Sequence, residues 1–231
     1  MTAIAWLYAT GLAATHIIGT RLGDGFRRRE PLTSFSAGVT VTYVFLQLLP
    51  EHQRALTYLG DFASLSVLAG FAGIHLAEKY AYQHDKSIAE LRQDLKEIHA
   101  AFLFIYYLII GIVLHELLRG SLLEGTLFFI PVLLHTAVSS ISLVELHETA
   151  LTSPLIRAAI TVAAVLGVAV AALTPLISTA VFHVLLGLVT GLFLYVVIRD
   201  SLPAEESGAP AYFLAGMLIY TAIVVRIWLL G

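Results

Sequence analysis

The 231-residue chain contains no cysteine, which excludes a disulfide framework and any metal site built from thiolates. Charged residues are also scarce, at 13% of the chain, about half the share that is usual in soluble domains. The net charge of -3 is small and no basic cluster is present, so we expect no nucleic-acid partner. Residues 2–20 lack the basic segment that opens a cleavable secretory signal, and we interpret them as the first helix.

Apolar residues dominate instead: they make up 58% of the chain, and the mean hydropathy is +0.87. A helix needs ~20 mostly apolar residues to cross a bilayer, and its backbone must be hydrogen-bonded internally. The sequence therefore predicts an all-α, polytopic membrane helix bundle, with residues 1–231 as a single transmembrane domain in a lipid bilayer. About eight spans are predicted, at residues 2–20, 32–50, 61–81, 100–120, 124–147, 155–174, 176–198 and 209–230.

The loops between the spans predict an orientation. The longest polar stretch, residues 82–99, is expected to be a cytoplasmic loop after the third span, with apolar residues at the spacing of an amphipathic helix. Lys and Arg gather in the odd-numbered loops, whereas the even-numbered loops hold only Arg54. Because these residues prefer cytoplasmic loops, both termini are expected to be extracytoplasmic, in an inner or plasma membrane.

Two segments of the sequence echo one another. Residues 38–50 read GVTVTYVFLQLLP and residues 191–203 read GLFLYVVIRDSLP, with Gly, Tyr and Leu-Pro at matching or nearly matching places. These are the second and seventh predicted spans, so spans one to three and six to eight are predicted to be inverted repeats around spans four and five. Such a 3+2+3 arrangement is typical of transporters. Similar composition in two helices rich in small residues is the alternative explanation.

Ionisable residues inside spans usually mark a functional site, because their burial in lipid is costly. In the fourth predicted span, His115 and Arg119 share a helix face and Glu116 lies about 100° round from His115. The alternative is that these three side chains form a polar network that holds no ligand.

In the fifth predicted span, His135 and Ser139 share a face and Thr136 lies beside them. If spans four and five are adjacent and antiparallel, His115 and His135 are expected to meet near mid-bilayer. Two imidazoles and the Glu116 carboxylate suit zinc, iron(II), cobalt or nickel.

Other candidates lie along the same route. Gln47 in the second span is a candidate fourth ligand that faces the same cavity. Glu51 is expected at the outer mouth, and His147 and Glu148 at the inner end of span five, as collecting and exit groups. For all three, a solvated helix end is the alternative.

The pattern resembles the ZIP family of divalent metal transporters. Residues 37–51, AGVTVTYVFLQLLPE, are similar to the family's second helix, where Gln47 stands in the place of a His, and residues 190–205 are similar to its seventh helix. The resemblance implies eight spans in a 3+2+3 arrangement, both termini outside, and transport of a divalent metal.

The resemblance extends to the family's metal motifs. Residues 115–120, HELLRG, stand where the fourth-helix motif His-Asn-x-Pro-Glu-Gly lies, so that Arg119 replaces the metal-bridging Glu. Residues 135–140, HTAVSS, stand at the fifth-helix motif His-Glu-x-Pro-His-Glu. The kinking prolines of both motifs are missing, so both helices are expected to be straighter than those of the family.

Two functions follow as hypotheses. The first is a ZIP-like carrier that moves a divalent metal of the zinc/iron class by alternating access, with Arg119 as a fixed positive charge beside the site. The second is a repurposed member in which Arg119 fills the former metal site, acting as a carrier of a non-metal substrate or as a subunit or regulator. A homodimer or a membrane complex is the expected assembly. An enzyme is not expected: a metallohydrolase needs three metal ligands and an activated water, and Arg119 beside the site disfavours both.

Overall fold

The computed structural model describes residues 2–22, 29–84, 87–146, 154–174, 177–196 and 208–229. In these ranges the chain is almost entirely helical, without strands, as the sequence predicts. The helices are α1 (Thr2–Leu22), α2 (Arg29–Tyr43), α3 (Leu49–Leu59), α4 (Phe62–His84), α5 (Ile88–Gly120), α6 (Leu122–Leu146), α7 (Pro154–Leu173), α8 (Thr179–Val196) and α9 (Pro210–Trp228). A π-helical turn, η2 (Val44–Leu48), joins α2 to α3, so the second predicted span continues to Leu59.

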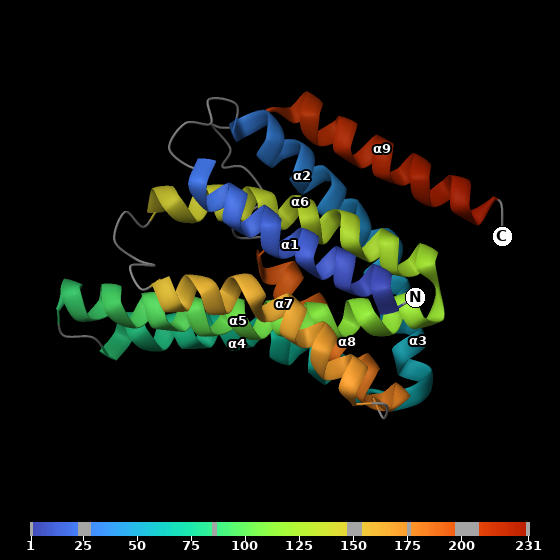
Figure 1. Ribbon diagram of the computed structural model, residues 1–231, viewed down its shortest axis with the longest axis horizontal. Coiled ribbons are helices and arrows are strands. Elements are labelled where there is room, and N and C mark those ends of the chain that lie inside the picture. The colour runs from blue at the N-terminus through green and yellow to red at the C-terminus, as the bar shows by residue number, and fades with distance from the viewer. Residues whose placement is uncertain are drawn as a thin grey trace.

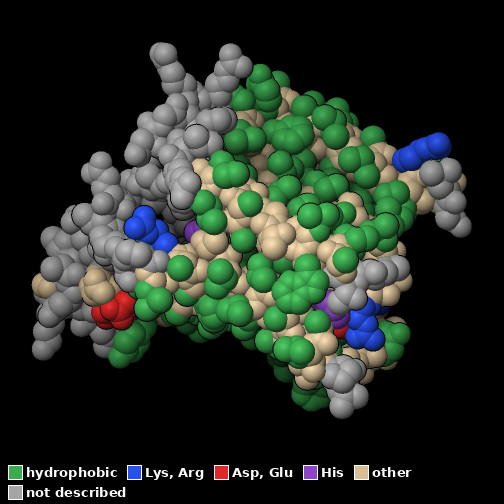
Figure 2. Space-filling model, viewed as in Figure 1, with side chains coloured by type: hydrophobic (Ala, Val, Ile, Leu, Met, Phe, Trp, Pro, Cys, Tyr) green, Lys and Arg blue, Asp and Glu red, His purple; other side chains and the backbone are tan. Residues whose placement is uncertain are grey.

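The helices have the apolar character that a bilayer requires. Four apolar stretches are long enough to cross a membrane, at residues 30–59, 100–120, 155–173 and 210–228, and shorter ones lie in α1, α4, α6 and α8. On the face that Figure 2 shows, hydrophobic side chains cover the middle, and the coloured charged side chains lie towards the two ends of the long axis. This distribution matches a protein whose middle meets acyl chains and whose ends meet water.

The predicted cytoplasmic loop is shorter than expected. Residues 82–84 complete α4, and the amphipathic segment 88–99 is the first part of α5, which continues without a break to Gly120. With 33 residues, α5 is about 50 Å long, so it must extend well beyond a hydrocarbon core of about 30 Å.

The connections divide between the two ends of the bundle (Figure 1). The start of α1, the end of α9, the α5–α6 turn, the end of α7 and the start of α8 lie at one end, and α1, α4 and α6 end at the opposite end. This separation is the one that eight alternating spans produce. Which end faces the cytoplasm stays a prediction from the loop charges.

The helices pack as two groups of four. One group, the α1 half, contains α1, α2, α6 and α9, held together by the α1–α6, α2–α9 and α2–α6 contacts. The other, the α7 half, contains α4, α5, α7 and α8, held by the α5–α7, α4–α8 and α5–α8 contacts. Exchanging α1 with α7, α2 with α8, α9 with α4 and α6 with α5 converts the first set of contacts into the second, as expected of inverted repeats.

The two halves meet along a seam formed by the α1–α7, α5–α6 and α1–α5 contacts. The second span crosses this seam, because α2 packs in the α1 half whereas α3 packs on α4 and α8. The crossing coincides with η2. Pro50 explains the π turn: it has no N–H for the carbonyl four residues earlier, and here the Leu49 N–H bonds the Val44 carbonyl instead.

The echoing glycines occupy equivalent helix crossings. A Cβ on Gly38 in α2 would lie 2.1 Å from the carbonyl oxygen of Phe213 in α9, and one on Gly191 in α8 would lie 2.0 Å from that of Val67 in α4. Only a glycine permits such close approach of two backbones, which is a common basis for helix association in membranes. The sequence echo therefore reflects a shared packing role as well as shared composition.

Besides Pro50 at the start of α3, a proline lies inside α6. This helix therefore contains a residue that can kink it. Pro131 removes the N–H that would bond the Leu127 carbonyl, and the buried Tyr220 hydroxyl of α9 donates a 2.8 Å hydrogen bond to that carbonyl. In lipid no water can replace this bond. Tyr220 therefore compensates for the proline and fixes α9 on α6.

We predict that Tyr220→Phe lowers stability by about 1–2 kcal/mol, because the Leu127 carbonyl loses its donor while the ring packing is kept. Thermal unfolding in detergent measures the change. Tyr212→Phe is the matched control on the same helix, since that side chain is 52% exposed, and it should leave the melting temperature unchanged. Equal effects of the two substitutions would contradict the role given to Tyr220.

We also predict that Gly38→Ala and Gly191→Ala destabilise the fold by similar amounts, about 1–3 kcal/mol each, because the added methyl collides with backbone in both crossings. Gly120→Ala is the control, since its Cβ would meet nothing within 4 Å. Thermal melting of the three variants provides the comparison. A harmless Gly191→Ala beside a damaging Gly38→Ala would argue against equivalent repeats.

Candidate functional site

The predicted cluster of the fourth span lies near the end of α5 and forms a local network. The Glu116 carboxylate lies 3.1 Å from Nδ1 of His115, and Nη1 of Arg119 donates to both of its oxygens at 2.9 and 3.2 Å. His115 is buried, but the Arg119 side chain is 53% exposed. Arg119 is therefore paired within its own helix, one residue before α5 ends, and it does not fill a central cavity.

His135 lies elsewhere, at a different height in the bundle. The centroid of its ring lies 6.5 Å from that of Tyr106 in α5 and 5.6 Å from that of Phe193 in α8. The hydrogen bond between Tyr107 and Thr136 fixes the register of α5 against α6. His115 is eight residues beyond Tyr107, which is about 12 Å along the helix axis.

The predicted meeting of His115, Glu116 and His135 is therefore not formed. In the described ranges, no group of three His, Asp or Glu side chains could hold a metal ion. On α5, the residues level with His135 and Thr136 are Tyr106 and Tyr107. Their side chains are phenols, whereas the predicted metal site needs an imidazole and a carboxylate there.

The remaining predicted residues are dispersed. Gln47 is half-buried in η2. Glu51 pairs with Arg54, which also lies 3.8 Å from Glu124 of α6, at the end of the bundle that holds the α5–α6 turn. Thr136 lies in the seam, as described below. His147, Glu148 and the side chain of Ser139 lie outside the described residues.

The seam is where buried polar side chains of different helices meet in the middle of the bundle. Tyr107 of the α7 half donates a 3.2 Å hydrogen bond to Thr136 of the α1 half, and the Thr136 hydroxyl donates to the Val132 carbonyl. Nδ1 of His16 in α1 lies 3.0 Å from Oγ1 of Thr161 in α7. Both contacts between side chains join one half to the other.

Aromatic rings extend this polar seam across the bundle. The His16 ring lies 6.2 Å from that of Tyr107, which contacts Tyr106 at 5.3 Å, and Tyr106 contacts His135. Phe193 then links His135 to Tyr43 of α2 at 6.1 Å. A continuous band of rings thus runs from α1 to α2 through α5, α6 and α8, and it closes the middle of the protein.

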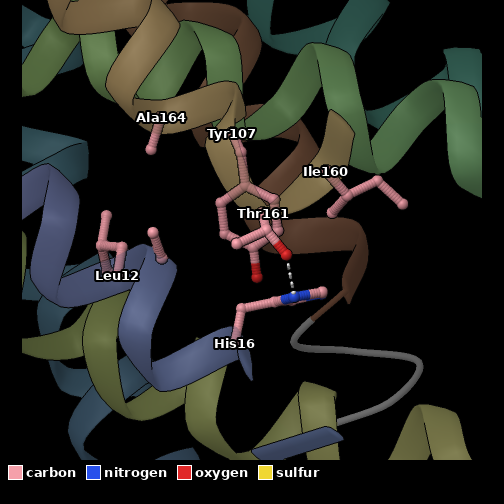
Figure 3. A pocket seen from close by; sticks show the side chains of 7 residues that line it. Leu12, His16, Tyr107, Ile160, Thr161 and Ala164 are labelled. Carbon is pink, nitrogen blue, oxygen red and sulfur yellow. Dashed lines mark hydrogen bonds between the residues drawn. The ribbon is translucent and has the colours of Figure 1, made fainter. Parts of the chain in front are cut away.

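A crevice opens beside this band, between α1, α5 and α7 (Figure 3). In the close-up, the His16 ring and the Thr161 hydroxyl point towards each other from α1 and α7, with Tyr107 behind them. The crevice is too narrow for a water molecule, and its other lining residues are apolar: Leu12, Ala13, Ile160 and Ala164. It is a closed contact between the halves that separation of α1 from α7 would open.

The middle of the protein has hydrogen-bonding groups but no fixed charge. No Asp, Glu, Lys or Arg occurs in residues 2–20, 31–50, 62–77, 98–115, 125–144, 158–173, 179–198 or 210–225. Two hydroxyls are buried without a hydrogen-bond partner among the described residues, those of Thr40 and Tyr106. An unsatisfied buried hydroxyl is costly and often indicates a water, ion or ligand that completes it.

Sequence reasoning missed most of these seam residues. Tyr106, Tyr107, Thr161 and His16 are not among the site residues predicted from the sequence. A phenol or hydroxyl inside an apolar span was the available signal, but it is weaker than that of an ionisable group.

Comparison with protein-family models and with curated proteins finds no match to this chain. The resemblance to the ZIP family thus rests on the sequence segments alone.

Proposed function

We propose that this chain is a membrane carrier whose two halves move against each other and expose the seam alternately to the two sides of the membrane. One observation carries the proposal. Polar side chains pair across the seam, through His16–Thr161 and Tyr107–Thr136, whereas glycines bring backbones together within the halves at Gly38, Gly191 and Gly111.

The symmetry of the two halves supports the same function. The two halves exchange when the inverted repeats are exchanged. A state that is open to one side of the membrane therefore has a counterpart that is open to the other side and has a similar packing energy. The side-chain hydrogen bonds described across the seam are neutral, so no ion pair has to separate when the halves move apart. The interlocked glycine crossings favour each half moving as a unit.

The chemistry of the seam favours a small, uncharged, hydrogen-bonding solute. His135, Thr136 and the free Tyr106 hydroxyl offer both donors and acceptors in the middle of the bundle, and the residues around them carry no fixed charge that could neutralise a dication. Such a solute would replace the ring and hydroxyl contacts that now close the seam.

Transport of a divalent metal is the second candidate, and the resemblance of residues 37–51 and 190–205 to ZIP helices supports it. His135 and His16 are the imidazoles that the described part of the seam could offer it, and the opened state would have to bring further donors to them. This geometry is less favourable than that of a site with carboxylates.

The absence of cysteine permits a direct test of the carrier. We predict that Ala164→Cys, on the α7 wall of the crevice, reacts slowly with a membrane-impermeant maleimide applied to either side of reconstituted vesicles. Alternating exposure of the seam to water is the reason. Mass spectrometry of the labelled protein gives the rate from each side.

Two control positions define the result. Val39→Cys, buried beside the Gly216 crossing within the α1 half, should stay unlabelled, and Gly120→Cys, at the exposed end of α5, should react from one side only. If Ala164→Cys is as silent as Val39→Cys from both sides, the carrier proposal is wrong.

The metal candidate predicts a different result. Zinc, iron(II), manganese or cobalt at millimolar concentration should then raise the melting temperature, and His135→Ala should abolish the rise, because a ligand that binds the folded state stabilises it. We expect no shift that depends on His135. A shift that His135→Ala removes and Glu116→Gln preserves would favour the metal candidate over the uncharged solute.

A further inference from the structure

His16 occupies a special place in the seam proposed above. It is 3% exposed, it belongs to α1, and its hydrogen bond reaches α7, the counterpart of α1 in the second repeat. The α1–α7 contact maps onto itself when the repeats are exchanged, so His16 lies in a helix contact of the seam that is shared equally by the two repeats. A bond at this position must change whenever the halves separate.

Imidazole is the side chain that changes charge near neutral pH. The residues that line the crevice with His16 are apolar or hydroxylic, and none carries a charge. A proton added to His16 in the closed seam would therefore place a charge among groups that solvate it poorly, and would require both ring nitrogens to donate. Exposure to water removes that cost.

We infer that His16 is a proton-binding residue that couples protonation to opening of the seam; the inference rests on the proposed carrier function. Because the proton binds more tightly when the ring meets water, a lower pH shifts the protein towards the open seam, and opening raises the proton affinity of His16 by the same factor. The carrier would thus bind a proton in its open states and release it as it closes.

The groups that face His16 support its assignment over its neighbours. From α5, Tyr107 presents a phenol, which does not ionise near neutral pH. From α7, Thr161 is the direct partner, and Arg157 lies one turn earlier with an exposed side chain. From α6, the Tyr8–Thr126 contact sets a register that brings residue 134 level with His16, so among the described residues His135 is a second group able to titrate nearby.

The experiment uses the Ala164→Cys reporter in reconstituted vesicles between pH 5.5 and 8. Labelling rates are divided by those of Gly120→Cys at the same pH, which removes the intrinsic pH dependence of the thiol. We expect the corrected rate to rise as pH falls, by up to about tenfold per pH unit, the limit for one linked proton. His16→Gln in the reporter background should abolish this slope.

Two further variants separate a proton site from a merely structural contact. Thr161→Val removes the bond across the seam but keeps the imidazole, so labelling should be faster at every pH with the slope preserved. His135→Gln should also preserve the slope. His16→Asn repeats the test if His16→Gln fails to fold, as judged by its melting temperature.

A corrected rate that keeps its slope in His16→Gln overturns the inference while leaving the carrier proposal intact. If the pH dependence is lost in His135→Gln but kept in His16→Gln, the proton binds at His135, and the inference for His16 is also overturned. Absence of labelling from both sides at every pH removes both proposals together.

Discussion

A bilayer interior offers no water to a polar group, and this constraint organises the whole protein. Polar groups in the middle therefore depend on partners inside the bundle, either within one half or across the seam. Pro131 shows the first solution, since the carbonyl that it orphans is taken by Tyr220 from another helix of the same half. The seam shows the second, with His16 and Tyr107 bonded across the boundary between halves.

The same constraint explains why the halves hold together without charge. Lipid tails are as apolar as the side chains that face them, so close backbone packing has to drive helix association. The glycine crossings provide it, with Gly38 against α9, Gly191 against α4 and Gly111 against α7. Charged side chains are left to the ends, where Glu116 pairs with Arg119, and Arg54 lies between Glu51 and Glu124.

Much of this fold could be predicted from the sequence, because long apolar runs leave few alternatives. The described helices lie close to the eight predicted spans, with α2, η2 and α3 together forming the second, and the echo between residues 38–50 and 191–203 indicated the repeat that the helix contacts display. The site was less predictable. Ionisable residues inside apolar spans pointed to His115 and His135, although a one-residue turn at Ser121 puts them six and fourteen residues from the turn. Their different heights could have been read from that count, whereas the pairing of His16 with Thr161 depends on tertiary packing.

The account's central claim is that the two halves move against each other at the seam. Because the chain has no cysteine, pairs of introduced cysteines can carry spin labels. Pulsed electron paramagnetic resonance then gives the distances between the two labels. A pair on α1 and α7 should show at least two distances whose populations change with pH, and a pair on α2 and α9, within the α1 half, should show one fixed distance. A single unchanging distance across the seam, under conditions that populate every state of the protein, would contradict the account.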